Sequence, residues 1–227
     1  MRQQYFAITV FLYSMLVVCF HEVTLAASYE MADTQMHVMQ TSDTRNQDYM
    51  LYVQLPTGYE DSGNRHKHYP VIYLLDPYWD FPVVAGARSG LVFDGIVPEY
   101  IVVGIGYSTQ GQVEEGDVVN ILRKIDYTPV RDASEPNTGD AAAFMSFIKS
   151  SVIPFVEDSY RIADYRVFAG TSSGGLFSLY LMFENPGLFQ GHIAIAPAVG
   201  YFHRWAFVKE SLFYGADPVH GLDPAGQ

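Results

Sequence analysis

The feature that most constrains the fold is the stretch 167–176, VFAGTSSGGL, where a short apolar run leads into a Gly-x-Ser-x-Gly pattern. A largely apolar segment from Leu176 to Phe183 follows. A strand, a very tight turn and a buried helix in this order form a nucleophile elbow, which would present the hydroxyl of Ser172 from a strained backbone. We expect Gly170 and Gly174 to be required, because a Cβ at either position would collide where strand and helix meet.

The alternative for this stretch is a glycine-rich turn between two core elements. That interpretation accounts for the glycines but gives no reason for the serine between them. The apolar strand before the pattern and the apolar helix after it are the context that the elbow requires, so the sequence favours a catalytic Ser172.

Composition narrows the kind of protein. The chain has 227 residues, of which 49% are hydrophobic and 17% charged, as expected for one globular domain with a sizeable core. A net charge of -12 argues against nucleic acid or anionic lipid as a partner, because phosphates would be repelled. Cys19 is the only cysteine and lies in the N-terminal segment, so we expect neither a disulfide nor a cysteine nucleophile in the mature protein.

The N-terminal segment has the features of a secretory signal. Arg2 is followed by a nearly continuous apolar run from Tyr5 to Phe20, and small residues suited to cleavage occur at Ala26 and Ala27. We predict a signal peptide at residues 1–26 and a mature domain at 27–227, secreted or periplasmic and without stable membrane insertion. The alternative is an uncleaved membrane anchor, although a run of about sixteen residues is short for a span that needs about twenty.

The remaining pattern alternates strands and helices. We expect an antiparallel pair at 36–40 and 48–55, strands at 69–75, 100–105, 166–170 and 192–196, and helices at 85–97, 140–160 and 174–185. Gly104 and Gly106 should end the second buried strand, Pro154 should kink its helix, and 107–136 should be irregular. This order predicts an α/β three-layer sandwich with a mostly parallel sheet.

A serine nucleophile needs a base, which in this architecture follows the serine along the chain. Three histidines follow Ser172: His192 opens a strand, His203 lies among aromatic residues, and His220 follows Asp217 in a polar segment. His220 with Asp217 is the best of these weak candidates, so the base and acid remain open.

The backbone N–H groups of Ser173 and Tyr78 are the predicted oxyanion hole, since Pro77 has no N–H to give. His66 and His68 lack carboxylate or cysteine partners nearby, and we expect no metal and no cofactor.

Several words of the chain resemble the putative-esterase branch of the α/β-hydrolases, which includes ferric-siderophore esterases, S-formylglutathione hydrolases and mycolyltransferases. The matching segments are 55–59 (LPTGY), 69–76 (YPVIYLLD), Arg123 with 126–129 (DYTP), 147–148 (FI), 153–155 (IPF), 170–176, 186–189 (PGLF) and 193–197 (IAIAP). The resemblance covers about residues 48–215, and the Asp-Tyr-Thr-Pro word is typical of its siderophore-esterase side.

The chain departs from the pattern of that family at three places. Pro77 stands where the family usually has glycine, and Thr171 where it usually has histidine, but neither change disables a serine hydrolase. Similar proteins continue well beyond the strand near Ile193 and carry their catalytic histidine there. The resemblance therefore implies a domain that is incomplete at the C-terminus and lacks the last strands of the sheet.

Two functional hypotheses follow. The first is a serine carboxylic-ester hydrolase that forms an acyl-enzyme on Ser172 and acts on siderophore-like or other small esters. The alternative is a catalytically silent hydrolase scaffold, or a ligand-binding protein, without the catalytic histidine. The sequence leaves open the acyl and alcohol groups, the choice between hydrolysis and acyl transfer, and the oligomeric state.

Overall fold

The computed structural model describes residues 30–41, 48–108, 115–201 and 204–215. The chain divides into two units, Met1–Met31 and Ala32–Gln227, and the account below concerns the second. The predicted signal peptide lies outside the described residues. Within those residues, no helix combines the length and apolar character that a membrane crossing requires.

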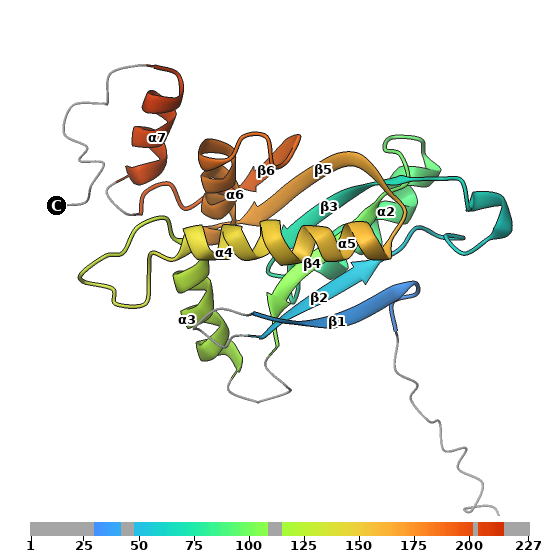
Figure 1. Cartoon of the computed structure of the whole chain (residues 1–227), viewed down its shortest axis with the longest axis horizontal. Helices are drawn as coiled ribbons and strands as arrows, with labels where there is room; N and C mark the ends of the chain where they lie inside the picture. Colours follow the sequence, from blue (N-terminus) through green and yellow to red (C-terminus); the bar gives the residue numbers. More distant parts are fainter. Residues whose placement is uncertain (1–29, 42–47, 109–114, 202–203, 216–227) are drawn as a thin grey trace, which may run out of the picture. The chain divides into compact units, whose positions relative to one another are not determined.

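A six-stranded sheet forms the centre of this unit (Figure 1). Its strands are β1 (Thr34–Gln40), β2 (Asp48–Gln54), β3 (Tyr69–Leu75), β4 (Ile101–Tyr107), β5 (Ile162–Thr171) and β6 (Gly191–Ile195), in the order β1-β2-β4-β3-β5-β6. β2 is antiparallel to both β1 and β4, whereas β4, β3, β5 and β6 run parallel to one another. The predicted antiparallel pair and the mostly parallel sheet are confirmed.

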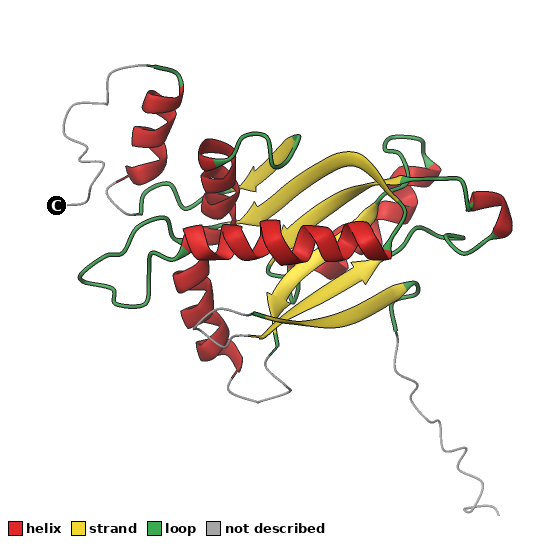
Figure 2. Cartoon of the chain, viewed as in Figure 1, coloured by secondary structure: helices red, strands yellow, loops and turns green. Residues whose placement is uncertain are grey.

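Helices cover both faces of the sheet, which confirms the three-layer architecture (Figure 2). The helical segments are η1 (Ser62–Asn64), α2 (Asp80–Phe93), α3 (Glu115–Tyr127), α4 (Ala141–Phe147), the π-helical turn η2 (Ile148–Val152), α5 (Ile153–Ser159), α6 (Ser173–Glu184) and α7 (Trp205–Phe213). The long helix formed by α4, η2 and α5 crosses one face of the sheet, and α2 lies on the other (Figure 1).

Aromatic side chains join the sheet to the helices on the α4 face. Tyr49 of β2 stacks on Phe147 with ring centroids 4.4 Å apart, and Phe144 approaches Phe177 of α6 at 5.0 Å. Phe168 of β5 extends the cluster towards the loop before β6. Such pairs add about 0.5–1.5 kcal/mol each beyond the area that they bury, so this cluster fixes α6, and with it the elbow, against the sheet.

The prediction that glycines end the second buried strand was wrong. β4 runs through Gly104 and Gly106, and the ring of Pro77 packs against both. A Cβ on Gly104 would lie 2.8 Å from Pro77 Cβ, and one on Gly106 would lie 2.6 Å from Pro77 Cγ. These glycines therefore make room for a neighbouring loop rather than stop the strand.

Two helices were missed and a third was misplaced. α3 occupies part of the segment 107–136, which was expected to be irregular, and α7 lies where no element was expected. α2 begins at Asp80 rather than at 85, because the N–H groups of Trp79 and Asp80 bond to the Asp76 carbonyl and start the helix there. Pro154 lies in the first turn of α5, directly after the π-helical turn η2, and the helix runs on through both. The kink expected at Pro154 stays a prediction.

Candidate active site

Ser172 occupies the turn between β5 and α6 with the geometry of an elbow. Its φ is 58° and its ψ is -116°, a combination that non-glycine residues adopt only under strain. The turn is held by backbone bonds: the Ser172 N–H donates to the Ile195 carbonyl, and the Ser172 carbonyl accepts from Ala198 and Leu176. The residue is exposed, so the predicted strained and accessible serine is confirmed.

The glycines of the turn only partly match the prediction. A Cβ on Gly170 would lie 2.3 Å from the Gly174 carbonyl oxygen, so glycine is required there, as expected. A Cβ on Gly174 would meet nothing closer than Asp76 Oδ2 at 3.4 Å, so the prediction for Gly174 was wrong. The tighter position is Gly175, whose Cβ would lie 3.1 Å from the carbonyl oxygens of Gly170 and Ile195. The second close contact of the turn therefore lies at Gly175, one residue after the last glycine of the Gly-x-Ser-x-Gly motif.

Asp76 follows the neighbouring strand β3 and lies close to the start of α6. Its backbone has a φ of 54°, and its carboxylate is buried. Arg123 of α3 forms a bidentate ion pair with this carboxylate: Nε donates to Oδ1 at 2.6 Å and Nη2 donates to Oδ2 at 2.8 Å. The Tyr127 hydroxyl donates to Oδ1 at 3.3 Å. Three donors converge on the two carboxylate oxygens, an arrangement that favours the ionised form of Asp76.

Charge and burial oppose each other in this pair. Burial raises the pKa of Asp76 above its ordinary value, and the bonds from Arg123 limit the rise. Burial lowers the pKa of Arg123, but the hydrogen bonds that Arg123 donates to Asp76 and the negative charge of that carboxylate outweigh the effect of burial. The pKa of Arg123 is therefore raised overall. The Arg123 guanidinium also lies between two aromatic rings, 5.5 Å from the centroid of Trp79 and 5.6 Å from that of Tyr127. A cation is thereby fixed in orientation near the elbow.

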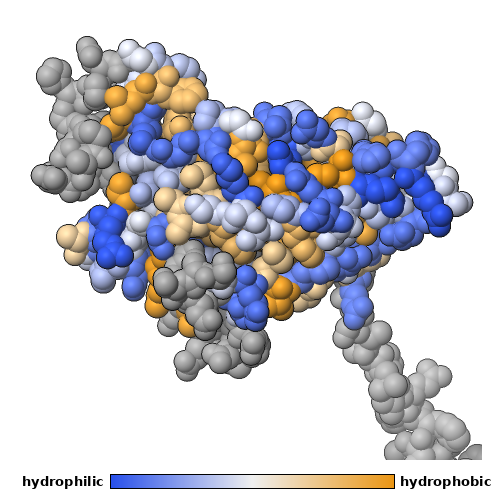
Figure 3. Space-filling model, in the orientation of Figure 1, coloured by the Kyte–Doolittle hydropathy of each residue, from blue (hydrophilic) through white to orange (hydrophobic). Residues whose placement is uncertain are grey.

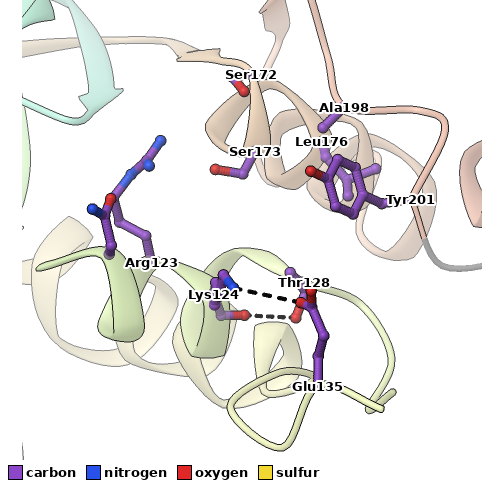
Figure 4. Close-up of a pocket in the computed structure, with 10 residues that line it drawn as sticks. Arg123, Lys124, Thr128, Glu135, Ser172, Ser173, Leu176, Ala198 and Tyr201 are labelled. Carbon is purple, nitrogen blue, oxygen red and sulfur yellow. Dashed lines mark hydrogen bonds and ion pairs between the residues drawn. The ribbon is translucent and has the colours of Figure 1, made fainter. Parts of the chain in front are cut away.

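A cavity of about 410 Å³, here called the inner cavity, opens in front of Ser172. It is lined by Asn120, Arg123, Lys124, Thr128, Glu135, Ser172, Ser173, Leu176, Ala198 and Tyr201. Figure 4 shows Ser172 and Ser173 on one side of it and Arg123, Lys124, Thr128 and Glu135 on the other. The cavity therefore brings a strained serine and two basic side chains together in a space large enough for a small organic ligand.

The Asp-Tyr-Thr-Pro word forms the end of α3 and its link to the next segment. The Tyr49 hydroxyl donates to buried Asp126 at 2.7 Å, and Tyr127 reaches Asp76. The Thr128 hydroxyl donates to the Lys124 carbonyl at 2.7 Å and accepts from the Gly139 N–H at 2.6 Å. Of this word only Thr128 lines the inner cavity, whereas Asp126 and Tyr127 hold the end of α3 against the core and against Asp76.

The two predicted oxyanion donors lie on neighbouring elements. Ser173 begins α6 and lines the inner cavity, whereas Tyr78 follows β3 and is not among the lining residues. The Tyr78 hydroxyl donates to the Tyr107 carbonyl, which ties the loop after β3 to the end of β4. The use of their backbone N–H groups as an oxyanion hole stays a prediction.

Of the three histidines considered as the base, the structure describes only His192. His192 lies on β6 with Nδ1 3.5 Å from the Ser178 hydroxyl, and burial lowers its pKa, so it is a partly buried histidine of the core. His203, Asp217 and His220 lie outside the described residues. Of the residues described, no histidine lines the inner cavity. Thr171, which stands where the family pattern usually has histidine, makes a different contact: its hydroxyl donates to Asp80 Oδ2 at 2.8 Å.

Sequence reasoning missed the partnership of Asp76 with Arg123 and the contribution of Asn120 and Lys124 to the cavity. Asp76 and Arg123 each lie in a segment that resembles the family, but they are 47 residues apart, and no sequence pattern linked one to the other. The available signal was the position of Asp76 at the carboxyl end of a buried strand, where parallel α/β sheets collect functional groups.

Comparison with known proteins places these features in context. The family described as "Putative esterase" matches residues 42–213. The ferri-bacillibactin esterase BesA of Bacillus subtilis is 31% identical over 211 residues, which cover 83% of this chain and 68% of that protein. The siderophore triacetylfusarinine C esterase of Aspergillus fumigatus is 28% identical over 163 residues, and the match spans 68% of this chain but only 53% of that relative.

Among solved structures, the BES protein from Bacillus cereus superposes with a TM-score of 0.70 at 25% identity. The match covers 86% of this chain and 72% of that one. The family match at residues 42–213 contains strands β2 to β6, the elbow and the helices around the inner cavity.

Proposed function

The chain belongs to the family described as "Putative esterase", and on this premise we propose that it is an exported serine esterase whose nucleophile is Ser172. The observation that carries the proposal is the strained, exposed serine at the β5–α6 turn, facing a cavity that also contains Arg123. Export rests on the apolar run from Tyr5 to Phe20, which supports a secreted or periplasmic location.

In this mechanism, Ser172 Oγ bonds to the carbonyl carbon of an ester, and the bond from that carbon to the alcohol oxygen breaks. The alcohol leaves with the proton of the serine hydroxyl. Water then cleaves the acyl-serine, which releases the acid and restores the hydroxyl. The N–H groups of Ser173 and Tyr78 are the proposed donors to the oxyanion, each contributing roughly 3–4 kcal/mol to the transition state.

The proposed substrates are small, oxygen-rich esters of the siderophore type. Two relatives are named for siderophore esters, and the basic side chains of Arg123 and Lys124 line the same cavity as Ser172. Arg123, held by Asp76, and the more exposed Lys124 both supply N–H donors that suit a substrate carrying carboxylate, phenolate or carbonyl oxygens.

A fluorophosphonate probe tests the nucleophile directly. We expect the probe to add one phosphonyl group to the wild-type protein, on the peptide that contains Ser172, and Ser172→Ala to abolish the adduct. Ser173→Ala should still be labelled, because only its backbone N–H has a role. Measurement of the intact mass and of the labelled peptide distinguishes the two serines, and an adduct that persists in Ser172→Ala would remove Ser172 from the proposed role.

A silent scaffold that binds an ester without cleaving it is the second candidate. It is favoured by the lining of the inner cavity, which contains no histidine among the described residues. Tight binding of a ferric siderophore without turnover supports this candidate. Hydrolysis of p-nitrophenyl butyrate by purified protein, lost in Ser172→Ala, excludes it.

A further inference from the structure

A second cavity, here called the outer cavity, adjoins the inner one and also measures about 410 Å³. Asn120, Lys124 and Glu135 line both cavities, so the two spaces share a wall. Ile121, Ser134 and Asn137 line only the outer cavity. Ser172 lies in the inner cavity alone, so the outer cavity is a place for a part of a ligand that does not react.

The boundary between the cavities is a weak ion pair. Lys124 Nζ lies 3.7 Å from Glu135 Oε2, and both side chains are largely exposed. Direct charged hydrogen bonds are about 2.7–2.9 Å long, and exposed pairs contribute less than about 1 kcal/mol. A ligand that crosses the boundary can therefore take Lys124 from Glu135 at little cost. Figure 4 shows this pair on the side of the inner cavity opposite Ser172.

The segment that forms the far wall of the outer cavity is held by its own bonds. The Asp132 N–H donates to the Thr138 hydroxyl at 2.9 Å, and the Ser134 N–H donates to Asp132 Oδ1 at 2.8 Å. Gly139 has a φ of +92°, and a Cβ there would lie 2.2 Å from the Arg131 nitrogen. Thr128 fastens Gly139 to the end of α3. The outer cavity is therefore preformed, which lowers the ordering cost of binding.

We propose that the outer cavity is a subsite for a second, polar arm of the ester whose scissile bond lies at Ser172. Lys124 and Asn120, on the shared wall, are the specificity-determining residues. This inference rests on the proposed function, because it assigns Ser172 to the scissile ester. A short monoester fills only the inner cavity, whereas the ammonium of Lys124 and the amides of Asn120 and Asn137 suit an arm rich in amide, phenolate or carbonyl oxygens.

A substitution that fills the outer cavity tests the subsite. Asn137 is exposed and does not line the inner cavity, so Asn137→Trp introduces bulk without disturbing the core. We expect the ratio of kcat/KM for ferric bacillibactin to kcat/KM for p-nitrophenyl butyrate to fall at least fivefold. The matched control, Lys149→Trp, lies on the exposed side of η2 and should change this ratio less than twofold. An unchanged ratio in Asn137→Trp overturns the proposal.

Binding measurements test the subsite independently of catalysis. In the Ser172→Ala background, we expect Asn137→Trp and Lys124→Met each to raise the Kd for ferric bacillibactin at least fivefold by titration calorimetry, with Lys149→Met as the control for the lost charge. If the wild-type protein cleaves neither ester but Asn137→Trp weakens binding, the proposed function fails, and the outer cavity is a binding subsite for a ligand that is not cleaved. Equal Kd values across all variants overturn the subsite, whatever the activity.

Discussion

The ion pair between Asp76 and Arg123 shows how burial changes the importance of a contact. Arg123 Nε lies 2.6 Å from Asp76 Oδ1, with side-chain exposures of 18% and 5%. The pair between Lys67 and Glu99 is almost as short, at 2.8 Å, but its side chains are 39% and 33% exposed. Water solvates much of the second pair, whereas each buried charge of the first depends on the other for the stabilisation that water would otherwise give.

We predict that Asp76→Asn lowers the free energy of unfolding by about 3–5 kcal/mol, because it leaves the Arg123 guanidinium without its carboxylate in a mostly buried site. Glu99→Gln, the exposed counterpart, should cost less than about 1 kcal/mol. Urea unfolding of both variants beside the wild type measures the difference. Equal losses would show that burial does not govern these two pairs.

Local features of the site were predictable and distant ones were not. The elbow at Ser172 follows from ten consecutive residues, so its strand, its turn and its exposed serine could be predicted from the sequence. The close contact of a Cβ falls at Gly175 rather than Gly174 because the backbone of Ile195 and Pro197, from a later part of the chain, packs against Gly175. The residues of the elbow alone do not contain this information. The Asp76–Arg123 pair likewise needed the fold to bring β3 and α3 together.

At the scale of elements, β6 carries a histidine into a row of aromatic residues. His192 pairs in register with Phe168 of β5, which pairs with Tyr73 of β3. His192 Nε2 is buried and has no hydrogen-bond partner among the described residues, and burial lowers the pKa of the ring. The fold therefore accepts the neutral imidazole more readily than the charged one.

The stability of the domain should accordingly fall as His192 takes up a proton. Its pKa is lower in the fold than in the unfolded chain, so its contribution is complete above about pH 6.5 and is lost as the pH falls from there through the lowered pKa. We predict a shallower pH dependence of the unfolding free energy in His192→Gln than in the wild type, measured in urea at pH 7.5, 6.5 and 5.5. Parallel curves would contradict this assignment.

The elements that were missed have physical reasons. α3 was missed because its segment is rich in carboxylates and turn formers, and its first residues, Glu115, Gly116 and Asp117, are typical of a loop. The two glycines of β4 suggested the end of a strand, because glycine adopts many other conformations easily. In the structure both lie within the strand and leave room for the ring of Pro77 beside it. Tertiary contacts decided both cases, whereas the strands of continuous apolar residues, such as β3, needed no such information.

For the whole molecule, hydrophobic character is unevenly distributed. Figure 3 shows hydrophobic residues gathered over α7 and hydrophilic residues at the opposite end, around η1. Phe207, Leu212 and Phe213 of α7 are exposed. On the sheet, β6 is an edge strand that pairs only with β5 among the described strands, and its Ile193 and Ile195 are 44% and 53% exposed. An apolar edge of this kind favours association with another strand.

We predict that the purified chain associates as its concentration rises and that Ile193→Lys reduces this association, since a charge on an edge strand opposes pairing. Val83→Lys is the control, because Val83 is also exposed but lies on α2. Sedimentation velocity over a series of concentrations measures the effect. A wild-type chain that stays monomeric throughout, or an equal response in the control, would count against the edge as the cause.

The contact of Pro77 with Gly104 and Gly106 also shapes how such a sequence can change over time. With proline at 77, a Cβ at 104 or 106 would clash, so we expect a substitution of either glycine to require a change at 77 as well. At position 104 the ring of Phe81 would also have to move, because its Cδ2 would lie 3.0 Å from the new Cβ. The loop that follows Asp76 and the neighbouring strand β4 are therefore expected to change together, so the order of mutations should matter as much as their identity.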